Sequence, residues 1–172
     1  MTKRQEALAE QFMSALNDED RVLFGSLFGC LTELGYVPQK ERANLTFKHD
    51  KHHKQIAKMG MKKGTDAVPA LFLRFSACRG YSERFEAVVR DAILRSPSKA
   101  PRCTEQACDF CRGDARTHIY THVFPDGERA HCGAFALEIP NLTSGDLPEI
   151  KGLLREEHAY LLKHEAVSRT PE

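Results

Sequence analysis

The sequence predicts an α+β fold: one antiparallel sheet covered by helices, with a small zinc-knuckle-like insertion closed by a β-hairpin. Two observations favour this class. Apolar residues recur at helical spacing near both ends of the chain and after Ser82, whereas the region from Tyr36 to Cys78 alternates polar and apolar residues as strands do. A chain of 172 residues can bury a core as one domain, which we expect to span 1–167, with a tail at 168–172.

An αα-hairpin is predicted at the N-terminus. Between residues 3 and 17, apolar side chains recur every four positions on one face, at Leu8, Phe12 and Leu16. The Asn17-Asp-Glu-Asp20 segment supplies a turn and capping oxygens for a second helix, which ends at Gly35. We expect this hairpin to cover one face of the sheet.

Three strands and a helix are predicted next. Leu45 and Phe47 alternate with polar neighbours, residues 56–62 form a second candidate strand, and 70–78 is the clearest β segment. Ser82 then caps a helix whose apolar residues form one stripe.

The last third of the chain predicts a hairpin and a helix. Strands are expected at 118–124 and 129–139, joined by Pro125-Asp-Gly127, because proline presets φ at the first turn position and glycine accepts a positive φ at the end. The final helix is predicted from about Asp146, where Asp146-Leu-Pro-Glu149 resembles a capping box with proline in the first turn.

The composition argues against several classes of protein. A net charge of +1 disfavours a protein that coats nucleic acid. No apolar run approaches the roughly 20 residues that a membrane span needs, and the N-terminus lacks the apolar stretch of a signal peptide. We therefore expect a cytoplasmic protein without a membrane partner, whose clustered cysteines are metal ligands or redox groups rather than disulfides.

Four cysteines within thirty residues predict a metal site: Cys103, Cys108, Cys111 and Cys132. Zinc takes four ligands in a tetrahedron, and the Cys-x2-Cys pair formed by Cys108 and Cys111 supplies two from one turn. Cys132 adds a third from the returning hairpin strand, and Cys103 is the preferred fourth because four thiolates form a common closed set. Since a closed set leaves no position for water, this zinc would stabilise the fold rather than catalyse a reaction.

The fourth ligand and the metal both have alternatives. If the hairpin turn carries a G1 bulge, Cys132 lies opposite Tyr120, and His118 and His122 become diagonal neighbours that could replace Cys103. The spacing Cys-x4-Cys-x2-Cys with a distant fourth cysteine is also that of plant-type [2Fe–2S] sites, although this loop lacks glycine.

One basic stretch, Lys48-His-Asp-Lys-His-His-Lys54, could bind a phosphate-bearing ligand or nucleic acid. No aromatic residue interleaves it to stack a base, so a solvated edge strand or loop is the favoured interpretation. Its His52 and His53 are a weak metal-binding signal, because no acidic or thiol partner is evident. Cys30 and Cys78 lie in apolar contexts that are typical of core residues.

Several short motifs carry a resemblance to a known family. They are Leu34-Gly-Tyr36, Leu73-Arg-Phe-Ser-Ala77, Tyr81-Ser82, the cysteine cluster and Cys132-Gly133. In these the chain resembles a family of bacterial cysteine-cluster proteins of unknown function, whose members often carry a tighter Cys-x2-Cys-x2-Cys run. The resemblance implies the architecture and a metal site, and no activity.

Together these patterns predict a non-enzymatic binding or regulatory domain with a structural zinc. Its partner would be a small molecule or a protein, and nucleic acid is not expected. The alternative is a redox or hydrolytic enzyme that uses the metal of the cysteine cluster, zinc or [2Fe–2S], directly.

Overall fold

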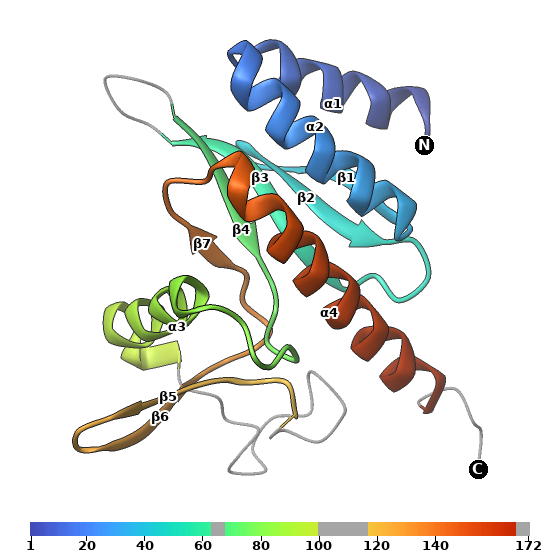
Figure 1. Ribbon diagram of the computed structural model, residues 1–172. Helices are drawn as coiled ribbons and strands as arrows, with labels where there is room; N and C mark the ends of the chain where they lie inside the picture. Colours follow the sequence, from blue (N-terminus) through green and yellow to red (C-terminus); the bar gives the residue numbers. More distant parts are fainter. Residues whose placement is uncertain (63–67, 100–116, 168–172) are drawn as a thin grey trace.

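A computed structural model describes residues 1–62, 68–99 and 117–167 (Figure 1). Its helices are α1 (Lys3–Ser14), α2 (Asp18–Glu33), α3 (Glu83–Arg95) and α4 (Leu147–Val167). Its strands are β1 (Tyr36–Glu41), β2 (Asn44–His49), β3 (Gln55–Lys62), β4 (Val68–Leu73), β5 (Tyr120–Phe124), β6 (Gly127–His131) and β7 (Leu137–Ile139). The predicted α+β class is confirmed. The tail at 168–172 lies outside the described residues, and the predicted domain boundaries stay a prediction.

The main sheet has five strands in the order β1-β2-β3-β4-β7, and all neighbours are antiparallel. One face is apolar, because paired residues such as Ala57 and Leu73, or Leu71 and Ile139, present their side chains to the same side. These residues join the hydrophobic core, and α1, α2 and α4 lie over this face in Figure 1. The sheet is therefore packed on one face by three helices.

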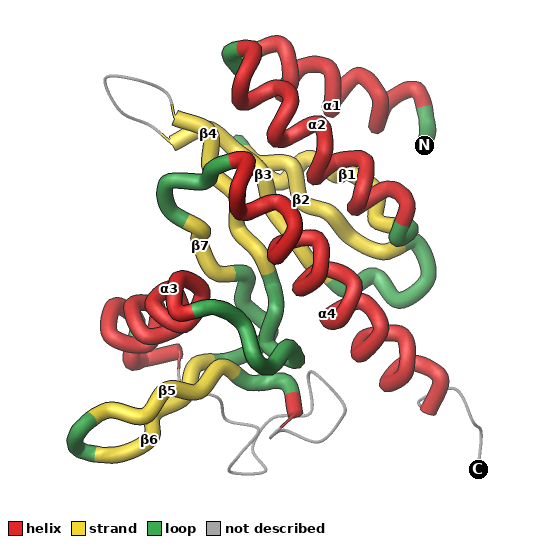
Figure 2. The backbone as a smooth tube through the Cα atoms, in the orientation of Figure 1, coloured by secondary structure: helices red, strands yellow, loops and turns green. Residues whose placement is uncertain are grey.

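The second face of the sheet carries polar and aromatic residues. Lys58 pairs with Phe72 across β3 and β4, and Phe72 pairs with Glu138 across β4 and β7, so their side chains share this face. Helix α3 does not cover it directly. It packs against β7 and against the separate β5–β6 hairpin at one end of the molecule (Figure 2).

The N-terminal αα-hairpin is set by caps that the local sequence supplies. Thr2 and Gln5 form a capping box at the start of α1, and the Asn17 side chain accepts a hydrogen bond from the Asp20 amide at the start of α2. Phe12 and Phe24 meet edge to face with ring centroids 5.5 Å apart, which packs the two helices together.

Two predicted strands are shorter than expected. The segment 70–78 leaves the sheet after Leu73, and the strand predicted at 129–139 divides into β6 and β7. In the first case the Arg74 amide still donates to Ile56 of β3 at 2.7 Å, but the Phe75 amide donates to the Tyr120 hydroxyl at 3.0 Å. In the second case the Cys132 amide donates to the Lys99 carbonyl at 3.0 Å. In both places the backbone is satisfied by partners outside the sheet, so the ladder ends.

The predicted cap of the last helix is also displaced. The capping box is formed by Thr143 and Asp146, around a 3-10 turn at Ser144–Asp146, and α4 begins at Leu147. Glu149, which was expected to close the box, instead accepts hydrogen bonds from the amide and hydroxyl of Ser82 at 2.7 and 2.9 Å. Its carboxylate thus joins α4 to the start of α3.

A buried ion pair joins the sheet to α4. Arg74 Nε lies 2.7 Å from Glu157 Oε1, and the two side chains are 5% and 0% exposed. The contact is ionic rather than an aligned hydrogen bond, since Arg74 Nε has no partner with hydrogen-bond geometry among the described residues. Burial raises the pKa of Glu157, and Arg74 opposes that shift. Ser76 Oγ also lies within hydrogen-bond distance of Glu157, at 3.3 Å.

Candidate functional site

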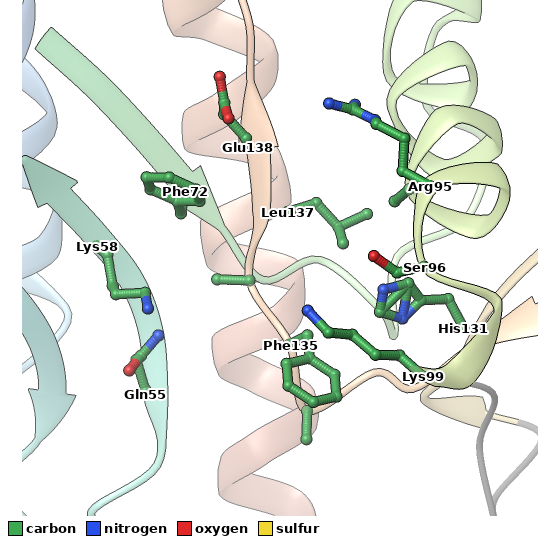
Figure 3. A pocket seen from close by; sticks show the side chains of 13 residues that line it. Gln55, Lys58, Phe72, Arg95, Ser96, Lys99, His131, Phe135, Leu137 and Glu138 are labelled. Atoms are coloured by element: carbon green, nitrogen blue, oxygen red, sulfur yellow. The ribbon is translucent and has the colours of Figure 1, made fainter. Parts of the chain in front are cut away.

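A cavity of about 590 Å³ opens beside the second face of the sheet (Figure 3). Its walls come from separate parts of the chain: Lys58 and Phe72 from the sheet, Arg95 from the end of α3, Lys99 from the turn that follows, and His131 from the end of β6. In Figure 3 the ammonium ends of Lys58 and Lys99 extend from opposite walls toward the middle of the space.

The charge around this cavity is positive. Lys58, Arg95 and Lys99 contribute three cations, and Glu138 is the one carboxylate among the described residues that line it. Glu138 forms an ion pair with Lys62, so most of its charge is already balanced. A cavity with this balance favours an anionic occupant.

Aromatic rings hold two of the cations at the wall. Lys58 Nζ lies 5.8 Å from the centroid of Phe72, and Lys99 Nζ lies 4.8 Å from the centroid of Phe135. Such cation–π contacts restrict long side chains without neutralising them. Arg95 is oriented in a different way, because its Nε donates to the Asp91 carbonyl at 3.2 Å, and its remaining guanidinium donors have no partner within the described ranges.

His131 is the buried polar group of the wall. It is 3% exposed, and its Nδ1 has no hydrogen-bond partner among the described residues. Its ring lies against Phe135, with centroids 5.6 Å apart. Burial, followed by the charge of Lys99, lowers the pKa of His131, which favours the neutral ring. An unpaired buried nitrogen beside three cations is where a ligand oxygen or hydroxyl would gain a hydrogen bond.

Of the four predicted zinc ligands, Cys132 alone is described. Cys103, Cys108 and Cys111 lie outside the described residues. Cys132 is half-buried and follows β6 directly. Its amide donates a hydrogen bond to the carbonyl of Lys99, which is the last described residue before the segment that contains the other three cysteines.

The predicted register of the hairpin is wrong by one residue. Phe124 pairs with Gly127, so the turn has two residues and no bulge, and Tyr120 pairs with His131 rather than with Cys132. A shift of one residue exchanges the two faces of a strand. His131 therefore shares a face with Tyr120, the position that the bulged turn had assigned to Cys132.

The two reserve ligands of the cysteine site have other contacts. His118 is buried, and its Nδ1 lies 3.0 Å from the hydroxyl of Tyr160 on α4. His122 Nδ1 lies 3.4 Å from a carboxylate oxygen of Glu86 on α3. Each histidine thus ties the hairpin to a different helix.

The structure also brings together three histidines that sequence reasoning did not combine. His49 ends β2, His52 lies in the turn after it, and His158 comes from α4, and one nitrogen of each lies within 4.8 Å of the other two. This group could hold a metal ion. Burial, followed by His49, lowers the pKa of His52 to about 4 and lowers that of His158. His52 was noted as a weak metal signal, but its distant partner His158 gave no sequence signal.

No protein-family model, no curated protein and no solved structure matches this chain. The chemistry of the cavity is therefore inferred from its own residues. Among the helices of the described ranges, none combines the length and apolar character needed to cross a bilayer.

Proposed function

We propose that this chain is a non-enzymatic binding domain whose cavity takes a small anionic molecule carrying a phosphate or carboxylate group. The observation that carries this proposal is the set of three cationic side chains, Lys58, Arg95 and Lys99, around a space whose carboxylate is already paired. The unpaired Nδ1 of buried His131 supports the proposal, since an anionic oxygen or a hydroxyl group of the ligand could form a hydrogen bond with this nitrogen.

Titration calorimetry with inorganic phosphate, and in parallel with acetate, tests this binding at low salt. We expect saturable binding that Arg95→Gln and Lys99→Gln each weaken by about 10- to 150-fold, because a charge-assisted hydrogen bond contributes about 1.5–3 kcal/mol. Added salt should weaken it further. The preference between the two probes then identifies the anionic group.

The matched control is Arg90→Gln. Arg90 is exposed on the same helix as Arg95, pairs with Asp91 and does not line the cavity. Arg90→Gln therefore changes the net charge by the same amount as Arg95→Gln but leaves the cavity unchanged. Equal affinity of the wild type and of the Arg95 and Lys99 variants would contradict the proposal. So would an Arg90 variant that weakens binding as much as they do, because that result indicates nonspecific attraction.

We further propose that Cys103, Cys108, Cys111 and Cys132 hold a structural zinc. The bond between the Cys132 amide and Lys99 supports this, because it lies at the point where the segment containing the other cysteines departs. Metal analysis should return about one zinc per chain for this site. Cys108→Ala should lower the melting temperature well beyond Cys30→Ala, which removes a buried core thiol on α2. If gently purified protein contains no metal, the zinc proposal is contradicted. A brown protein would indicate a [2Fe–2S] cluster instead.

A further inference from the structure

We propose that His49, His52 and His158 form a second metal site, which takes a divalent ion of the zinc class and ties the turn between β2 and β3 to α4. The site is distinct from the cysteine cluster and from the positively charged cavity. It uses nitrogen ligands only, and its three members come from two segments that are far apart in the sequence.

The turn after β2 holds two of the rings in place. The His53 amide donates to the His49 carbonyl at 3.0 Å, and His53 adopts a positive φ of 56°, which brings the chain back on itself. As a result, the rings of His49 and His52 stack with centroids 4.1 Å apart and planes 4° apart. His158 approaches from α4, with its ring centroid 5.4 Å from that of His49.

Packing explains part of this arrangement. The ring of Tyr36 meets all three histidines edge to face, at centroid distances of 5.1, 5.9 and 5.5 Å. Packing does not account for His52 Nε2, which is buried and has no hydrogen-bond partner among the described residues. A metal ion would supply this missing partner once the ring proton moves to Nδ1, which now accepts a 3.1 Å hydrogen bond from the Lys54 amide.

The ligand atoms select the class of metal. Imidazole nitrogens suit zinc, copper and nickel, whereas magnesium and calcium prefer oxygen. With metal–nitrogen distances of about 2.0–2.1 Å, tetrahedral ligand atoms lie about 3.3 Å apart. The present separations of up to 4.8 Å therefore require modest side-chain rotations toward one another. Three ligands leave a fourth position for water or an anion.

Nearby polar groups can orient two of the rings for metal binding. Asp50 Oδ1 lies 3.3 Å from His49 Nδ1, and the Tyr36 hydroxyl lies 3.3 Å from His158 Nδ1. When a metal binds at Nε2, the ring proton resides on Nδ1 and needs such an acceptor. At His49, Nδ1 would then exchange a 3.2 Å bond from the Lys51 amide for one to Asp50, and the exposed Lys51 amide would turn to water.

The test is titration with Co²⁺ and Zn²⁺, followed by the visible spectrum of bound cobalt and by NMR of the histidine rings. Cobalt bound by histidine lacks the intense near-ultraviolet thiolate band that the cysteine site would give. We expect cobalt to broaden the ring signals of His49, His52 and His158, and zinc to raise the melting temperature. Asp50→Asn should weaken binding about tenfold, and His52→Ala by more.

The matched control is His53→Asn, which removes an exposed histidine from the same turn, tolerates the positive φ of this position and should leave binding unchanged. His158→Gln keeps a hydrogen-bonding group toward Tyr36, so it separates loss of the ligand from loss of the fold. The proposal is overturned if His52→Ala and His158→Gln bind cobalt as the wild type does. It is also overturned if all bound cobalt shows the thiolate band and none broadens these rings. Neither outcome bears on phosphate binding in the cavity.

Discussion

Replacing Glu157 by glutamine is expected to destabilise the protein by about 3–5 kcal/mol, the usual effect of removing one partner from a buried ion pair. Arg74 stays charged and nearly fully buried, and it loses the carboxylate 2.7 Å away. The glutamine amide also has one acceptor oxygen where the carboxylate has two, and the Ala77 amide donates to one of those at 2.8 Å. Chemical denaturation measures the free energy of unfolding.

Glu156→Gln is the matched control for this prediction. Glu156 is exposed on the same helix and accepts a hydrogen bond from the Arg79 amide at 3.2 Å, so the charge change is equal but the burial is not. Its effect should stay within about 0.5 kcal/mol. The double variant Arg74→Met/Glu157→Leu should recover much of the loss, because it removes both buried charges. A loss below about 1 kcal/mol for Glu157→Gln would mean that other groups already balance the charge of Arg74.

Gly133→Ala is expected to be the second strongly destabilising change, because this glycine lies where two segments cross. A Cβ at this position would overlap the backbone carbonyl oxygen of His118 and would lie 2.6 Å from Ser76 Cβ. The Gly133 carbonyl also accepts a hydrogen bond from Ser76 Oγ at 3.0 Å, so the backbone cannot move without breaking it. We expect a loss of about 2–3 kcal/mol, the upper part of the usual range for overpacking.

Thermal melting checks this prediction. A loss of that size lowers the melting temperature by roughly 4–12 °C in a protein of this length. The control is Gly152→Ala, since a Cβ at Gly152 would meet nothing within 4 Å and alanine should stabilise α4 by about 0.5–1 kcal/mol. If Gly133→Ala melts with the wild type, the close approach of the hairpin to Ser76 must be able to relax at little cost.

Elements with local signals were predictable. The starts of α2 and α3 follow Asn17 and Ser82, because a capping side chain and the apolar stripe after it lie within a few residues of each other. The same holds for β2 and β3, where alternation over six to eight residues is enough to indicate a strand. Even so, the Ser82 hydroxyl donates to Glu149 and accepts no capping hydrogen bond from its own helix, which no local pattern indicates.

The candidate sites were less predictable. The cavity gathers Lys58, Arg95, Lys99 and His131 from four elements, none of which carries a spacing motif toward another. An unbulged two-residue turn would have given the pairing of His131 with Tyr120. The zinc assignment of the cysteine cluster stays a prediction, because three of its four members lie outside the described residues.

What the sequence determined by itself was the class of fold and the helices and strands whose signals span a few residues. Spacing could also single out the cysteines, because Cys-x2-Cys is a local pattern. The tertiary structure alone decided where strands end, after Leu73 and after His131, and which polar side chains meet, as His158 meets His49 and His52. The reason is physical: hydrogen bonds and burial join residues by distance in space, whereas a sequence pattern records only neighbours along the chain.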